Sequence, residues 1–121
     1  MAEDWVARMH RGLLELCILG LLENQSSYGY EIVTRLANTP RLAVNEGTVY
    51  PLLRKLKGLG WLATYWEESD SGPPRQYYKI SKKGNGKLVE LRSEWAGLVA
   101  EVDEILSTNT QSSSTDQLRE A

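Results

Sequence analysis

The chain has 121 residues, of which 41% are hydrophobic and 25% charged, and its formal net charge is −2. This composition indicates one globular domain with an appendage, and the net charge argues against a strongly basic nucleic-acid binder. The single cysteine excludes an internal disulfide, and the most apolar run, residues 12–22, is too short to span a membrane. We therefore expect a cytoplasmic protein with no membrane partner.

The charges are unevenly distributed along the sequence. Residues 48–87 hold eight basic and three acidic residues, a net charge of +5, whereas residues 1–47 carry −2 and residues 88–121 carry −5. A basic middle between acidic flanks indicates that this segment attracts a polyanion even though the whole chain is acidic.

The first part of the chain predicts two helices. The first is expected from about Asp4 to Leu22, and its apolar character on most sides is typical of a central helix covered by its neighbours. The second is expected from Tyr28 to about Asn38, with Ser27 as its N-cap.

A third helix is predicted between the N-cap Asn45 and the left-handed C-terminal residue Gly60. Its apolar residues recur at helical spacing and predict one buried side: Val49, Leu52, Leu53, Leu56 and Leu59. The opposite side carries Tyr50, Pro51 and Arg54, which are unusual where a helix faces water. We interpret this side as a binding surface, although a solvated amphipathic helix would show the same charge pattern.

Two runs of alternating residues follow, 62–66 and 76–80, and predict a β-hairpin. The sequence "ESDSGPP" between them indicates a rather long turn. Trp61 and Trp66 flank the first strand, and we expect them to pack the hairpin against the helices.

The last helix begins near "SKKGNGK" and carries apolar residues at steps of three and four, which is the spacing of a coiled-coil seam. This seam predicts a dimer interface formed by Leu88, Leu91, Trp95, Leu98, Val102 and Ile105. The Ser/Thr/Gln-rich residues 108–121 have little to bury and are expected to be disordered.

Three helices and a hairpin in this order predict a mainly α fold with a small β-hairpin, the winged helix-turn-helix. We place this domain at residues 4–81 and a C-terminal dimerisation helix at residues 82–107. In such a domain the third helix enters the DNA major groove and the hairpin is the wing. The predicted DNA-binding residues are Tyr30, Gly47, Thr48, Tyr50, Pro51, Arg54, Lys57 and Arg75.

Other chemistry finds little support in the sequence. His10 is the only histidine, so no set of residues has metal-ligand spacing, and no cofactor is expected. The carboxylates before the hairpin turn, Glu67, Glu68 and Asp70, are interpreted as a solvated turn rather than an acid/base pair. We therefore expect no enzyme. Two alternatives remain: a winged-helix module that binds a partner protein, and a dimer that sequesters aromatic molecules.

Several segments resemble one family. "YGYEI" at residues 28–32, "EGTVYPLLRKLKGLGWL" at 46–62 and "YWEESDSGPPRQYYKIS" at 65–81 are similar to the PadR family of bacterial transcriptional regulators, as is "RGLLELCILGLL" in the first helix. The resemblance implies a homodimeric repressor of a palindromic operator, released by a small ligand.

The short, single C-terminal helix resembles the compact subfamily that includes multidrug-responsive regulators. There a tryptophan of the dimerisation helix stacks on flat aromatic ligands, and Trp95 occupies a comparable position. Trp5 and Met9 would border the same gap. The alternative is that Trp95 only packs the dimer core, because seam positions bury apolar side chains.

Overall fold

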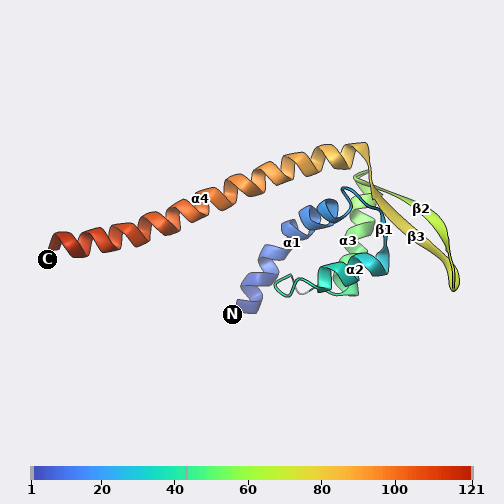
Figure 1. Cartoon of the computed structure of the whole chain (residues 1–121), viewed down its shortest axis with the longest axis horizontal. Coiled ribbons are helices and arrows are strands. Elements are labelled where there is room, and N and C mark those ends of the chain that lie inside the picture. The colour runs from blue at the N-terminus through green and yellow to red at the C-terminus, as the bar shows by residue number, and fades with distance from the viewer. Residues whose placement is uncertain (1, 43, 121) are drawn as a thin grey trace. The chain divides into compact units, whose positions relative to one another are not determined.

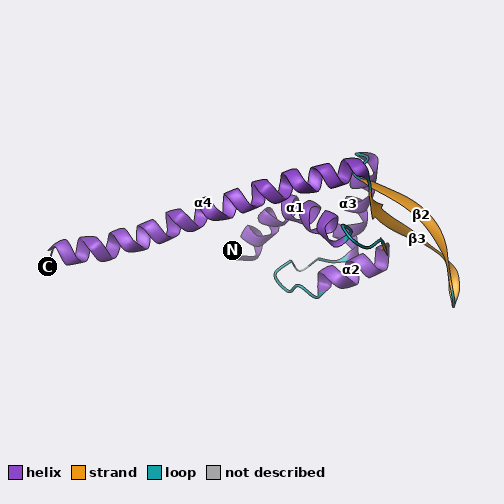
Figure 2. Ribbon diagram, turned by 45° about the horizontal axis from the view of Figure 1, so that its top comes forward, coloured by secondary structure: helices purple, strands orange, loops and turns teal. Residues whose placement is uncertain are grey.

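The computed structural model describes the backbone of residues 2–42 and 44–120, and the side-chain surroundings of residue 9 and of residues 12–42 and 44–107. The chain divides into two compact units, Met1–Val89 and Glu90–Ala121. Within the described residues the elements follow in the order that Figure 1 labels: α1 (Ala2–Leu21), β1 (Ser27–Tyr28), α2 (Gly29–Ala37), α3 (Glu46–Gly58), β2 (Leu62–Ser69), β3 (Gly72–Ile80) and α4 (Lys82–Glu120). Figure 2 distinguishes the helices from the hairpin strands by colour. The predicted fold class, mainly α with a β-hairpin, is confirmed.

The core of the first unit is built from the apolar faces of its helices. Its largest fully buried side chains are aliphatic: Ile18, Leu19, Leu22, Ile32, Val49, Leu53, Leu56 and Leu88. Each such side chain contributes about 1.5–3 kcal/mol relative to an exposed position. Because α1 supplies two of them, Ile18 and Leu19, the expectation of a covered central helix holds for its C-terminal half.

The ends of α3 are as predicted. Asn45 lies in extended backbone, and its side-chain oxygen accepts a 3.1 Å hydrogen bond from the Thr48 amide, which satisfies one free N–H of the first turn. At the other end Gly60 has φ +81°, the left-handed conformation that only glycine adopts without strain. Both signals are local, which is why the sequence reveals them.

The start of α2 differs from the prediction. Ser27 is not its N-cap: the residue forms β1 with Tyr28, pairs with Tyr78 of β3, and is fully buried. Its hydroxyl accepts a 3.2 Å hydrogen bond from Arg35. The helix begins at Gly29 because the chain first completes this antiparallel pairing, so the sheet has three strands in the order β1-β3-β2.

The wing, defined here as the hairpin β2–β3, has a shorter turn than expected. The strands extend to Ser69 and Gly72, and Pro73 and Pro74 lie within β3. Proline is tolerated there because β1 pairs only with Tyr77 and Tyr78, which leaves the proline segment on a free strand edge.

Trp66 does not pack the wing against the helices. Its side chain is 68% exposed, so that expectation is wrong. Trp61 is half-buried, with the Lys87 ammonium 5.2 Å from its ring centroid.

Helix α4 begins at Lys82 and passes the predicted boundary at residue 107 without ending there, since it is helical to Glu120. The side chains beyond 107 lie outside the described residues, and the expected disordered tail stays a prediction. Leu88 corrects the predicted seam: it is 1% exposed within the single chain, so its side chain belongs to the core of the first unit.

Candidate nucleic-acid interface

Helix α3 has two sharply different sides. Val49, Leu53 and Leu56 are completely buried, because they lie on the side that faces the core. The opposite side is exposed and includes every predicted contact of this helix except the half-buried Tyr50: Gly47, Thr48, Pro51, Arg54 and Lys57. The burial pattern thus leaves a polar and basic surface whose position is determined by the core.

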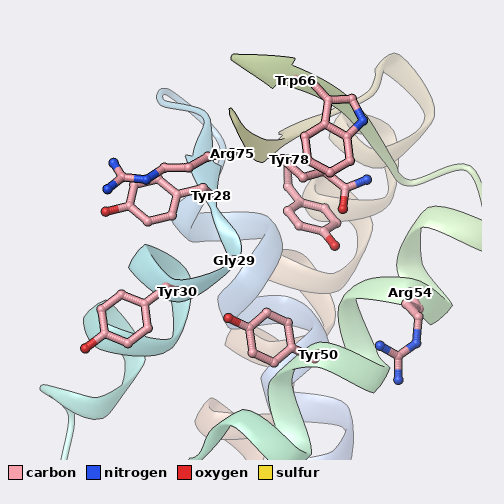
Figure 3. A pocket seen from close by; sticks show the side chains of 9 residues that line it. Tyr28, Gly29, Tyr30, Tyr50, Arg54, Trp66, Arg75 and Tyr78 are labelled. Atoms are coloured by element: carbon pink, nitrogen blue, oxygen red, sulfur yellow. The ribbon is translucent and has the colours of Figure 1, made fainter. Parts of the chain in front are cut away.

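Next to this surface lies a hollow of about 670 Å³. It is formed by three parts of the first unit, as Figure 3 shows: the β1–α2 junction, helix α3, and the wing. We call it the interface hollow and define it by its lining residues: Tyr28, Gly29, Tyr30, Tyr50, Arg54, Trp66, Arg75, Gln76 and Tyr78. Segments from both halves of the domain therefore meet at one concave, aromatic and basic surface.

Two phenols of the hollow have raised pKa values. Burial raises the pKa of Tyr50, and the carboxylate of Glu46 acts in the same direction. Burial also raises the pKa of Tyr78, against the opposing effect of the Arg54 guanidinium. Both hydroxyls therefore remain protonated at neutral pH and are able to donate hydrogen bonds to an anion.

The wing arginine lies against an aromatic ring. The guanidinium carbon of Arg75 is 4.4 Å from the ring centroid of Tyr28. Tyr28 makes an edge contact with Tyr77 at 5.4 Å, and Tyr77 stacks on Tyr65 at 5.5 Å. The strand register places Tyr28, Tyr65 and Tyr77 opposite one another on one face of the sheet. This ladder connects all three strands at the base of the wing.

The two arginines of the hollow have no ion-pair partner among the described residues. Lys55, the neighbour of Arg54 in the sequence, by contrast forms a 2.7 Å ion pair with Glu15 of α1. Adjacent basic residues of α3 thus have different roles: Lys55 joins α3 to α1, whereas the charge of Arg54 is available to an external anion.

The structure brings four predicted residues together at the hollow, namely Tyr30, Tyr50, Arg54 and Arg75. Gly47, Thr48, Pro51 and Lys57 are also exposed on α3 but do not line the hollow. The amide and the hydroxyl of Thr48 both donate hydrogen bonds to the side-chain oxygen of Asn45, the hydroxyl at 3.4 Å.

Sequence reasoning missed five residues that line the hollow: Tyr28, Gly29, Trp66, Gln76 and Tyr78. Tyr28 and Gly29 belong to the "YGYEI" segment, whose resemblance to the PadR family was the one signal in the sequence that could have pointed to them. Trp66, Gln76 and Tyr78 come from the wing. There the alternation of residues predicts strands, but it does not indicate which face of the hairpin lies next to a helix.

The second unit presents apolar side chains to solvent in the single chain. The exposed large hydrophobic residues of this part of α4 are Trp95, Leu98, Val102, Ile105 and Leu106, whereas Leu91 is half-buried. In the first unit Met9 is 43% exposed, while Trp5 lies outside the residues whose side chains are described.

Two kinds of site are absent from the described residues. No group of three or more His, Cys, Asp or Glu side chains is placed to hold a metal ion. Nor does any helix in this part of the chain have the length and apolarity needed to cross a bilayer.

Helices α1–α3, the β2–β3 wing and a basic exposed face on α3 define a winged-helix protein. Residues 18–90 match the model of the transcriptional regulator PadR-like family. The chain belongs to this family, whose members are transcriptional regulators and not enzymes.

The chain is also similar to individual proteins, two of which are PadR regulators of known structure. A PadR family transcriptional regulator from Eggerthella lenta is 32% identical, with a TM-score of 0.76 over 87% of this chain and 91% of that one. A PadR-like transcriptional regulator from Bacillus cereus is 34% identical, with a TM-score of 0.75 over 82% and 96%. An uncharacterized protein of Lysinibacillus sphaericus is 34% identical over 98 residues, which are 79% of this chain and 86% of the relative.

Proposed function

We propose that this protein is a transcriptional repressor that binds a palindromic operator as a homodimer, with α3 in the major groove. The observation that carries the proposal is the interface hollow, where α3 and the wing present two guanidinium groups without acidic partners among the described residues. Arginine side chains and neutral phenols are donors suited to phosphate oxygens and to the acceptor edges of bases.

The exposed side of α3 supplies the proposed base and phosphate contacts. Gly47 allows close backbone approach, and Thr48 and Tyr50 offer hydroxyl groups to phosphates. Arg54 suits a guanine or a phosphate, and Arg75 of the wing suits an adjacent minor groove or phosphate. Further contacts are assigned to Tyr30, Pro51 and Lys57.

A second copy of the chain would cover the exposed apolar residues of α4. The proposed dimer seam comprises Leu91, Trp95, Leu98, Val102 and Ile105, without Leu88, which its own chain buries. Pairing through these helices would present two α3 helices to successive major grooves about 34 Å apart.

Variants of adjacent residues provide the direct test of DNA binding. Fluorescence anisotropy with footprinted upstream DNA should show that Tyr50→Ala and Arg54→Ala each weaken binding about tenfold, the scale of one hydrogen bond to a charged group. Lys55→Ala is the matched control, because it removes the same charge from the same helix at a side chain that pairs with Glu15. Unchanged affinity in both test variants would refute the assignment of α3.

We further propose that a flat aromatic ligand binds beside Trp95 between the subunits and favours a dimer geometry with weaker DNA affinity. Titration with aromatic cations should quench tryptophan fluorescence, and Trp95→Ala should abolish the quenching. Quenching that persists in this variant would place the ligand elsewhere.

Two measurements separate the proposal from its alternatives. A protein-interaction module would show no salt-sensitive retention on heparin, whereas DNA binding predicts a log–log salt slope of about −0.9 per phosphate contact. A sequestering dimer would bind aromatic molecules without protecting any upstream DNA.

A further inference from the structure

The β1–α2 junction contacts two of the proposed DNA-binding side chains, one in the wing and one in α3. β1 ends at Tyr28 and α2 begins at Gly29, with no residue between them. Tyr28 lies against Arg75 of the wing, and Gly29 lies against Tyr50 of α3, as Figure 3 shows. Neither Tyr28 nor Gly29 is among the contacts proposed above.

The Gly29 contact is unusually close. A methyl group at this position would lie 2.6 Å from Cε1 of Tyr50 and 3.4 Å from both Cζ and the hydroxyl oxygen. The φ angle of Gly29 lies outside the left-handed region, so its backbone would accept alanine. The closest contact that a side chain at this position would make is therefore with the tyrosine ring, which occupies the space that the side chain would fill.

The Tyr28 contact is made through the ring face. With 4.4 Å between the Arg75 guanidinium carbon and the ring centroid, the geometry is that of a cation–π pair. The edge contact with Tyr77 holds the same ring from the central strand. A side chain as long as arginine has many rotamers at an exposed wing position, and stacking on Tyr28 restricts them.

We infer that the Tyr28–Gly29 step is a positioning element: Gly29 places the Tyr50 ring of α3, and Tyr28 places the Arg75 guanidinium of the wing, so that both are set in the interface hollow before DNA binds. This inference rests on the proposed function and deepens it. Two adjacent residues, Tyr28 and Gly29, thereby determine how two proposed DNA contacts are arranged relative to each other. These contacts, one in α3 and one in the wing, lie 25 residues apart in the sequence. Preorganisation of this kind improves affinity because less side-chain freedom is lost on binding.

The test is a set of double-mutant cycles on DNA affinity in the full-length protein, with unfolding curves measured for every variant. Gly29→Ala should weaken binding about tenfold in the wild type, the scale of one hydrogen bond to a charged group. In a Tyr50→Ala background the same substitution should change affinity by less than about twofold, the usual limit of additivity. Equal losses in both backgrounds would overturn the Gly29 assignment, because the change would then act through the fold.

The second cycle concerns the wing. Tyr28→Leu should weaken binding about threefold, the scale of an exposed cation–π pair, and should have no further effect on Arg75→Ala. Tyr28→Phe keeps the ring and should retain wild-type affinity. If phenylalanine behaves like leucine, the hydroxyl rather than the ring matters and the Tyr28 assignment fails. The crossed pairs, Gly29→Ala with Arg75→Ala and Tyr28→Leu with Tyr50→Ala, should be additive.

A DNA-free measurement separates this inference from the proposed function. In protein with isotope-labelled tyrosine, Gly29→Ala should shift the ring resonances of Tyr50. If the wild type binds no DNA, the proposed function fails, while the resonance shift still supports the placement of Tyr50 by Gly29. An unshifted Tyr50 ring overturns the placement whatever the DNA result.

Discussion

The hydroxyl of Ser81 donates a 2.6 Å hydrogen bond to the backbone carbonyl of Gly60, which ties the start of α4 to the end of α3. The same hydroxyl oxygen accepts a 3.0 Å bond from the Gly84 amide. The backbone strengthens this joint, since the Ser81 amide donates to the Trp61 carbonyl at 3.0 Å. The end of α3 and the first turn of α4 are thus held through one serine.

Ser81→Ala should lower the free energy of unfolding by about 1 kcal/mol, because it removes the N-cap of α4 and the bond to Gly60. Urea denaturation measures the loss. Ser69→Ala is the matched control: its hydroxyl donates to the Pro73 carbonyl near the wing turn, away from any helix end. Equal losses in the two variants would show that the joint contributes nothing specific.

Gly84→Ala should be strongly destabilising, by about 3 kcal/mol, through forced overpacking. A methyl group there would overlap the Trp61 carbonyl oxygen, and the Trp61 carbonyl carbon and Cγ1 of Ile80, each 2.9 Å away, leave little room to adjust. Gly86→Ala, two residues further along α4, has open space around the added methyl and should instead stabilise by about 0.5–1 kcal/mol. Thermal unfolding compares the Gly84→Ala and Gly86→Ala variants. Similar melting temperatures would contradict the close approach of Gly84 to the Trp61 carbonyl.

Asn45→Ala should cost about 1 kcal/mol of stability, since the Thr48 amide loses its side-chain acceptor. Asn45→Asp keeps an acceptor oxygen and should be close to wild type in chemical denaturation. A loss as large for aspartate as for alanine would mean that the cap does not act through this hydrogen bond.

Stability should fall in alkaline solution. The pKa values of Tyr50 and Tyr78 are raised in the folded protein above the ordinary value of about 10. Below that pH both phenols are protonated in the folded and the unfolded chain, so they add no pH dependence. Above it the unfolded chain ionises first, and the free energy of unfolding decreases as pH rises through the folded-state values.

Tyrosinate absorbance checks the alkaline prediction. The native protein should contain phenols that titrate later than those of the same protein in denaturant. Tyr50→Phe and Tyr78→Phe should each remove part of the late component. Superimposable absorbance titration curves for the native and the denatured protein would contradict the predicted loss of stability in alkaline solution.

The helical part of the fold follows from local signals. Asn45 and Gly60 mark the ends of α3 because a cap and a left-handed residue are recognisable within a few positions. β1 has only two residues and therefore no periodicity, so Ser27 resembled a helix cap when it was in fact a buried strand residue. Leu88 fits the heptad spacing of the seam, yet the core of its own unit covers it, and spacing alone does not distinguish these partners.

The candidate site was predictable only in part. Helical periodicity predicts which side of α3 is exposed, including Arg54, and places the half-buried Tyr50 at the margin of that side. The closeness of Gly29 to Tyr50 and of Tyr28 to Arg75 depends on how β1 pairs with β3. Pairing between strands so far apart in sequence is determined by the tertiary fold, which no short segment encodes.

Nuclear magnetic resonance of the isotope-labelled protein, titrated with the footprinted operator duplex, tests most directly whether the α3–wing surface binds DNA. The account predicts that backbone amide shifts concentrate in the first half of α3, at the Tyr28–Gly29 step and around Arg75. Shifts confined to α4, with those three places unchanged on saturation, would contradict it.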